Sequence, residues 1–169
     1  MKKIILATHN KDKIREVGEI FPDCEVIGVD SQAEETETTF SGNALIKARA
    51  VAKCHQGAWV MADDSGLEID YLNKEPGIYS ARYMGEDTSY KIKNQSLIDR
   101  LEGVEDEKRT ARFVCAIAAA FPDGSVEVTR GTIEGQIGYE EKGENGFGYD
   151  PIFYVPECGC TTAELSLEE

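Results

Sequence analysis

One stretch of the sequence decides the fold and carries its most informative polar residues: Trp59-Val60-Met61-Ala62-Asp63-Asp64-Ser65-Gly66-Leu67-Glu68-Ile69-Asp70-Tyr71. Its apolar start, Trp59–Ala62, predicts a buried strand that ends at Asp63-Asp64-Ser65-Gly66. The alternation of apolar and acidic residues from Leu67 to Tyr71 then predicts a half-exposed strand. Because α/β proteins keep their chemistry where strands end at a crevice, we expect functional residues at this point.

Strand and helix alternate before this stretch. Apolar runs predict strands over Lys2–Thr8 and Cys24–Val29. The helical spacing of apolar residues predicts helices over Lys11–Phe21 and Ser41–Cys54, the second with Ser41 as its N-cap. This order of elements is typical of α/β domains.

After the central stretch the pattern changes from alternation to a hairpin. We expect a loop, a helix, two strands joined by a turn and a glycine-rich loop, in this order: Asn73–Thr88, Ser89–Leu101, Arg112–Phe121, Val126–Ile133 and Tyr139–Tyr149. The fold class is therefore α/β, with an elongated mixed sheet and helices that form two lobes around a central cleft. We expect residues 1–169 to form a single domain.

Length and charge exclude several classes of protein. The chain has 169 residues and a net charge of −14, from 18 Lys plus Arg against 32 Asp plus Glu. This charge repels nucleic-acid backbone and anionic membrane surfaces, so we expect no polynucleotide or membrane partner. No segment approaches the roughly 18 apolar residues of a membrane span, and the short apolar N-terminus is no signal peptide. We expect a cytoplasmic protein, for which a small phosphate ligand stays possible.

The five cysteines are an odd number, which argues against a disulfide framework. Cys158-Gly159-Cys160 allows a zinc site as an alternative. Its spacing differs from Cys-x-x-Cys, however, and only His9 and His55 could complete the site. We therefore favour reduced thiols.

The polar segment Thr8-His9-Asn10-Lys11-Asp12-Lys13 joins the first expected strand to the first expected helix. Free backbone N–H groups and the helix dipole attract anions at such a position, and lysine adds positive charge. The segment has no glycine and is no Walker loop, so an ordinary polar loop is the alternative. Lys47, among apolar positions of the second helix, either lines a cleft or extends its charge into solvent.

The adjacent carboxylates of Asp63 and Asp64 suit a hard cation such as Mg²⁺. Since successive side chains of a strand point to opposite faces, we expect only one of the two to meet the metal. Glu34, Glu35 and Glu37 form an acidic run that either supplies a second carboxylate or is solvated surface.

Aromatic residues in the glycine-rich loop also suggest a ligand. Phe147-Gly148-Tyr149-Asp150 follows Gly143 and Gly146. Aromatic rings on such a backbone can stack on a nucleobase. The alternative is that the rings pin the loop to the core.

Taken together and in this order, these motifs resemble the inosine triphosphate pyrophosphatase family of non-standard purine nucleotide hydrolases. The similar segments span nearly the whole chain: Thr8-His9-Asn10 with Lys13, Ala33-Glu34-Glu35-Thr36, Asn43-Ala44 with Lys47-Ala48-Arg49, Ala62-Asp63-Asp64-Ser65-Gly66-Leu67, Pro76-Gly77-Ile78-Tyr79-Ser80-Ala81-Arg82-Tyr83 and Gly146-Phe147-Gly148-Tyr149-Asp150-Pro151-Ile152-Phe153.

The resemblance implies a homodimeric, Mg²⁺-dependent enzyme with a lobe-cleft-lobe fold. Such an enzyme hydrolyses ITP, dITP and XTP to the nucleoside monophosphate and pyrophosphate. The resemblance implies that the substrate is bound by residues 8–13, Lys47 and Ser65, and that Glu35 and Asp64 hold the metal. Asp64 would also be the catalytic residue, and the base pocket would be formed by Phe147, Gly148, Tyr149 and Asp150.

Members of that family continue with a Ser-His-Arg-Gly segment, which recognises the keto edge of the purine, and with a closing helix. This sequence ends at Glu169, and Ser166 with Glu169 has the spacing of a capping box. We therefore expect a complete phosphate and metal half of the site and an incomplete base-reading half. Two alternatives follow: a related pyrophosphatase acting on other modified nucleotides, and a catalytically impaired nucleotide-binding module.

Overall fold

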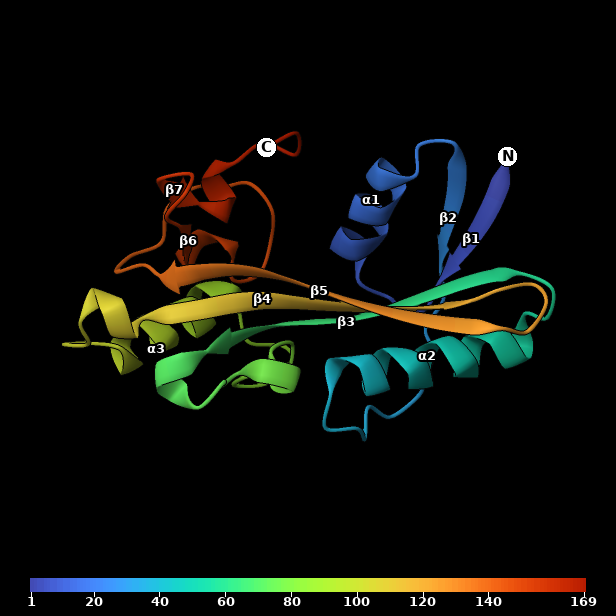
Figure 1. The fold of residues 1–169 in the computed structure, drawn as a ribbon, viewed down its shortest axis with the longest axis horizontal. Helices are drawn as coiled ribbons and strands as arrows, with labels where there is room; N and C mark the ends of the chain where they lie inside the picture. Colours follow the sequence, from blue (N-terminus) through green and yellow to red (C-terminus); the bar gives the residue numbers. More distant parts are fainter. The chain divides into compact units, whose positions relative to one another are not determined.

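The computed structural model describes residues 1–169 and contains one seven-stranded mixed sheet with the strand order β2-β1-β3-β4-β5-β6-β7 (Figure 1). The strands are β1 (Lys2–Leu6), β2 (Cys24–Gly28), β3 (Trp59–Ile69), β4 (Thr110–Ala120), β5 (Val126–Ile137), β6 (Phe153–Val155) and β7 (Cys160–Thr161). The helices are α1 (Lys11–Ile20), α2 (Phe40–Cys54) and α3 (Tyr90–Arg100). β1 runs parallel to β2 and β3, whereas β5, β6 and β7 are antiparallel. The predicted α/β class with a mixed sheet is confirmed.

The chain divides into two compact units. The first consists of Met1–Ser65 and Cys115–Gly131, and the second of Gly66–Val114 and Thr132–Glu169. The three longest strands, β3, β4 and β5, each contribute residues to both units. The predicted central cleft and the single-domain organisation stay predictions. No helix is long and apolar enough to cross a membrane.

The first unit is built around α2 and the parallel strands. Small side chains let α2 pack closely, and its Ala44 and Ala48 are fully buried. Leu6 of β1 and Val60 of β3 are also buried, which gives the sheet its apolar face. The predicted cap of α2 was wrong by two residues: the Thr39 side chain, not Ser41, accepts a hydrogen bond from the Gly42 N–H. Thr39 is the residue that has the extended backbone an N-cap requires.

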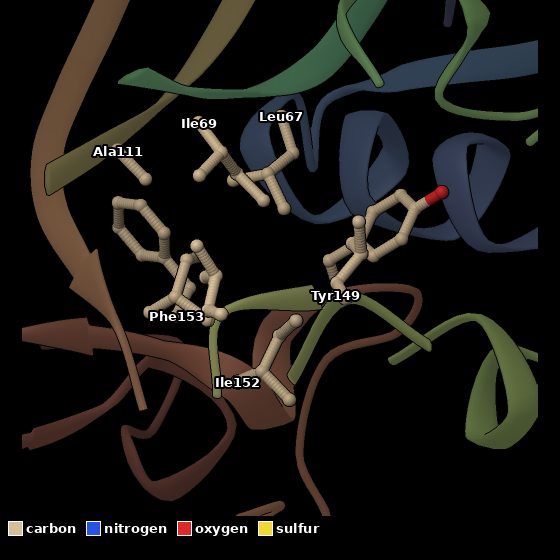
Figure 2. Packing of buried hydrophobic residues seen from close by; sticks show 9 residues of the cluster. Leu67, Ile69, Ala111, Tyr149, Ile152 and Phe153 are labelled. Carbon is tan, nitrogen blue, oxygen red and sulfur yellow. The ribbon is translucent and has the colours of Figure 1, made fainter. Parts of the chain in front are cut away.

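The second unit has its own apolar core, drawn in Figure 2. β3 and β4 contribute Leu67, Ile69 and Ala111, and the segment after β5 contributes Tyr149, Ile152 and Phe153. The Phe153 ring also packs against Phe113 with ring centroids 4.3 Å apart. Residues far apart in the sequence therefore fix the position of the Phe147–Asp150 loop through its Tyr149 side chain and the residues that follow it.

A buried arginine ties this core together. Arg109 is 1% exposed, and its guanidinium donates to the carbonyls of Ile137 at 2.9 Å, Leu101 at 2.7 Å and Gly138 at 2.8 Å. The guanidinium lies 4.1 Å from the centroid of the Tyr139 ring. Buried backbone carbonyls need hydrogen-bond donors, and this one side chain supplies three.

The central stretch forms one strand rather than two. β3 continues without a break from Trp59 to Ile69, so Asp63 and Asp64 lie within the strand and not at its end. Buried residues alternate with partly exposed ones up to Gly66, and the alternation changes phase at Leu67. The composition of Asp63-Asp64-Ser65-Gly66 predicts a strand end, because Asp and Gly are depleted in strands. The ion-pair and hydrogen-bond partners of the two carboxylates, which the local sequence does not reveal, make that position tolerable.

Candidate active site

The alternation of β3 gives Asp63 and Asp64 different surroundings. The side chain of Asp63 is 14% exposed and contacts Lys13 on α1. Asp64 is 5% exposed overall and interacts with Glu35, Asn43 and Lys47. This division agrees with the expectation that adjacent strand residues point to opposite faces. All of these residues belong to the first unit.

Asp63 holds a lysine and a serine at once. Its Oδ2 atom lies 2.6 Å from the Lys13 ammonium nitrogen and accepts a hydrogen bond from the Ser65 hydroxyl at 2.9 Å. Burial by itself would raise the pKa of Asp63, but the Lys13 ammonium outweighs burial and holds the pKa below its ordinary value. The same pairing raises the pKa of Lys13 against the opposing effect of burial. Both groups are therefore charged at neutral pH.

Asp64 lies in a second cluster of charges. The Lys47 ammonium is 3.1 Å from Glu35 Oε1, and both groups act on Asp64. Burial and the negative charge of Glu35 raise the pKa of Asp64 to about 6, although Lys47 and a hydrogen bond from Asn43 oppose the shift. The Oδ2 atom of Asp64 is buried and has no hydrogen-bond partner. A buried carboxylate oxygen without a donor is an electrostatic deficit that a cation would remove.

This donor set fits a magnesium ion. Mg²⁺ is commonly held by one or two carboxylates and completes its shell with water and substrate phosphate. Glu35 and Asp64 are two carboxylates close enough to affect each other, and Asp64 offers an unpaired oxygen. The chain has no cluster of three or more His, Cys, Asp or Glu side chains arranged as metal ligands. The arrangement therefore suits a water-rich metal shell rather than a closed zinc or calcium cage.

The start of α1 differs in detail from the predicted anion site. The Asn10 side chain caps the helix by accepting from the backbone N–H groups of Asp12 at 2.9 Å and Lys13 at 3.3 Å. Thr8 Oγ1 in turn accepts from the Asn10 N–H at 3.1 Å. The side-chain oxygen of Asn10 is therefore occupied by these two N–H groups, whereas its side-chain N–H₂ group takes no part in the cap. Of these residues, only Lys13 contacts the carboxylates of β3.

The other members of the predicted segment stay outside the charge cluster. His9 and Lys11 are exposed. Asp12 pairs with Arg15 at 2.9 Å, one helical turn further along. An acidic residue in the first turn of a helix also interacts favourably with the helix dipole, so the position of Asp12 has a structural explanation.

The predicted base-contact residues lie in the second unit. They form a tight turn in which Asp150 Oδ2 accepts from the Phe147 N–H at 2.9 Å. Gly148 has φ +64, a value that favours glycine. The Tyr149 side chain is 5% exposed and its hydroxyl donates to the Ser80 carbonyl at 2.5 Å. Of the two roles left open for these aromatic residues, Tyr149 has the structural one; the residue Phe147 is partly exposed.

Sequence reasoning missed two contacts of the first unit. It gave no partner to Asp63, which is paired with Lys13. It also gave no role to Asn43, which is fully buried, exchanges hydrogen bonds with the backbone of Glu37 and bonds Asp64. The available signal was the spacing of Asn43 and Lys47, which places both on one face of α2.

A model of the Ham1 family matches residues 4–169. The chain belongs to the Ham1 family. Among its Ham1 relatives are proteins named dITP/XTP pyrophosphatase. The one from Staphylococcus aureus strain MW2 is 48% identical over 174 residues, which cover 100% of this chain and 88% of the relative. The one from Desulforamulus reducens is 46% identical, and the match covers 99% of this chain and 86% of the relative.

Solved Ham1 structures have the same fold. The Ham1 protein of Staphylococcus aureus has a TM-score of 0.84 at 46% identity, and that of Coxiella burnetii 0.83 at 40%. A nucleoside-triphosphatase (dITP/XTP pyrophosphatase) from Mycobacterium abscessus has a TM-score of 0.78 at 39% identity. Each match covers 99% of this chain, and 88%, 89% and 90% of the three structures in that order. The resemblance inferred from the motifs is thereby confirmed.

Proposed function

We propose that this Ham1 protein is a magnesium-dependent pyrophosphatase that hydrolyses dITP, ITP and XTP to the nucleoside monophosphate and pyrophosphate. Identity of 46 to 48% along the whole chain to dITP/XTP pyrophosphatases supports the substrate class. The observation that carries the proposal is the largely buried cluster of Lys13, Asp63, Glu35, Lys47 and Asp64, in which Asp64 Oδ2 and Asp63 Oδ1 have no hydrogen-bond partner.

The two lysines are the proposed phosphate contacts. Lys13 and Lys47 are largely buried, with side chains 22% and 11% exposed, and each is held by one carboxylate. Partial burial strengthens the attraction of an ammonium for a phosphate oxygen, because water screens it less. Phosphoryl chemistry depends mainly on such positioning and charge neutralisation.

Glu35 and Asp64 are the proposed metal ligands. A magnesium ion bound there would neutralise phosphate charge and lower the pKa of a coordinated water. Asp64 would hold the ion and orient the attacking water, which assigns the catalytic role to this residue. Ser65 is held by Asp63 and is proposed to lie beside the phosphates.

Further features of the proposal rest on the resemblance. Phe147 is the partly exposed aromatic residue of its segment, and its ring is proposed to stack on the base. Gly148 and Asp150 shape the turn that carries this ring. A homodimeric assembly and a cytoplasmic location are proposed on the same basis.

Pyrophosphate release from a panel of triphosphates tests the proposal. We expect Mg²⁺-dependent release from dITP, ITP and XTP, less from TTP and UTP, and almost none from Asp64→Asn. Asp23→Asn is the matched control, since Asp23 is an exposed aspartate in the turn after α1. Preferential turnover of TTP or UTP would favour a pyrophosphatase of other modified nucleotides. Binding of ITP without turnover would favour an impaired nucleotide-binding module.

A further inference from the structure

A buried asparagine of α3 contacts the predicted base-contact loop. Asn94 is 1% exposed, although it lies in a helix whose neighbouring residues Gln95 and Asp99 are exposed. Its side-chain amide donates to Glu141 Oε1 at 2.9 Å and to the Gly148 carbonyl at 3.2 Å. These partners lie 47 and 54 residues further along the chain. A single side chain therefore fastens the Gly148 turn to the helix.

The hydrogen bonds of Asn94 are not optimised for stability. Its Oδ1 atom is buried and has no hydrogen-bond partner. An unsatisfied buried acceptor costs roughly 1 to 3 kcal/mol, whereas an apolar side chain at this position would avoid that cost. Features that reduce stability in this way are expected at functional sites. The presence of an asparagine here is thus better explained by what its amide N–H₂ group holds.

The same helix also holds the segment that the Tyr149 hydroxyl contacts. The Lys93 ammonium donates to the Ala81 carbonyl at 2.8 Å. The Tyr149 hydroxyl bonds the neighbouring Ser80 carbonyl, and the Tyr149 ring packs edge-on against Tyr90 with centroids 5.1 Å apart. These contacts fix the Tyr149 side chain. The amide of Asn94 instead contacts the backbone carbonyl of the preceding residue, Gly148.

The contact with Asn94 constrains a specific peptide group. Gly148 has φ +64 and Tyr149 has φ −86, the signs of the central residues in a type II′ turn. The peptide between them is planar and trans, so its carbonyl and N–H point in opposite directions. Because Asn94 holds the carbonyl toward α3, the Tyr149 N–H points away from the helix. The donor side of the turn is thereby fixed.

We propose that Asn94 is a positioning residue for nucleobase recognition, which holds the Gly148–Tyr149 peptide so that the turn presents its N–H and the Phe147 ring to the base. This inference rests on the proposed function and extends it to a residue outside the predicted site. Asn94 itself touches no substrate. Its loss should loosen the base contact and leave the charge cluster of the first unit unchanged.

Calorimetric binding separates the two halves of recognition. We expect Asn94→Ala to weaken binding of inosine monophosphate at least tenfold and to leave binding of pyrophosphate, with Mg²⁺ present, within twofold of wild type. Asn94→Asp keeps the shape of the side chain and removes the amide donor, so it should show the same two effects as Asn94→Ala. Gln95→Ala is the matched control, because Gln95 is exposed on the same helix and bonds only Asp99.

Steady-state kinetics give a second reading. We expect a raised KM for dITP in both Asn94 variants with kcat within about threefold of wild type, since the residues assigned to the chemistry are untouched. Equal losses of inosine monophosphate and pyrophosphate affinity, or wild-type values for both, would overturn the inference. Absence of pyrophosphate release from the wild-type protein would instead overturn the proposed function.

A measurement on the wild-type protein covers the case in which the variants fail to fold. Hydrogen exchange of the Tyr149 N–H should slow when inosine monophosphate is added and should not respond to pyrophosphate. Unchanged exchange with saturating inosine monophosphate would contradict the orientation assigned to this turn.

Discussion

The ion pair between Lys13 and Asp63 offers a quantitative test of the charge cluster. In the variant Lys13→Met, Asp63 stays buried with Ser65 as its remaining partner. Breaking a fully buried pair costs roughly 3 to 5 kcal/mol. The two side chains are 22% and 14% exposed, so some screening by water reduces the cost. We expect a loss of about 2 to 3 kcal/mol in the free energy of unfolding at pH 7.5.

The loss should depend on pH in a defined direction. In the wild type, Lys13 holds the pKa of Asp63 below its ordinary value, so the pair stabilises the fold above about pH 4 and less below it. In Lys13→Met, burial without the ammonium raises the pKa of Asp63. The buried carboxyl can then take up a proton as the pH falls. The difference between wild type and variant should therefore be largest at neutral pH and shrink toward pH 4.

Urea unfolding of a double-variant cycle measures this effect. Lys13→Met/Asp63→Asn removes both charges and should recover most of the stability lost in Lys13→Met. Lys3→Met is the matched control, because the Lys3–Glu25 pair is 3.7 Å apart with side chains 67% and 50% exposed. A double variant no more stable than Lys13→Met, or a difference that widens at low pH, would refute the reasoning.

Three further predictions concern the second unit. Arg109→Ala should lower the free energy of unfolding by about 3 kcal/mol or more in urea denaturation, since three carbonyls each lose a donor at about 1 to 3 kcal/mol, and Arg109→Lys should recover little because an ammonium cannot span the same three carbonyls. Arg112 of β4 donates hydrogen bonds to Asp70 and holds the pKa of that carboxyl far below its ordinary value. The stability difference between wild type and Asp70→Asn should therefore shrink as the pH falls below about 4. A difference in thermal unfolding that stays constant with pH would contradict this. In Gly146→Ala the new Cβ would lie 2.1 Å from the Asp150 carboxylate, so the KM for dITP should rise, whereas Gly159→Ala, with a similar φ of +67 and open space, should change only stability.

The sequence was sufficient to predict the elements that have a clear period. The apolar spacing of α1, α2 and α3 and the runs of β1 and β4 gave their bounds to within two residues. β3 was divided in two because Asp63-Asp64-Ser65-Gly66 has the composition of a loop. Those carboxylates are tolerated inside the strand because lysines and an asparagine from other elements compensate them.

Buried polar residues were the least predictable part. Asn94 and Arg109 lie among charged neighbours and look like surface positions, yet both are 1% exposed. Their partners are backbone carbonyls or side chains 8 to 54 residues away, and no local pattern encodes these contacts. The motifs identified the chemistry of the first unit, while the contacts that position those motifs needed the structure.

The products formed from dITP test the central claim most directly. Wild-type protein with Mg²⁺ and dITP should give dIMP and pyrophosphate in equal amounts, as resolved by phosphorus NMR of the reaction mixture. The same spectra should show almost no product with Asp64→Asn. Formation of dIDP and orthophosphate, or equal product from Asp64→Asn and wild type, would contradict the assignment of this chain as a pyrophosphatase that acts through Asp64.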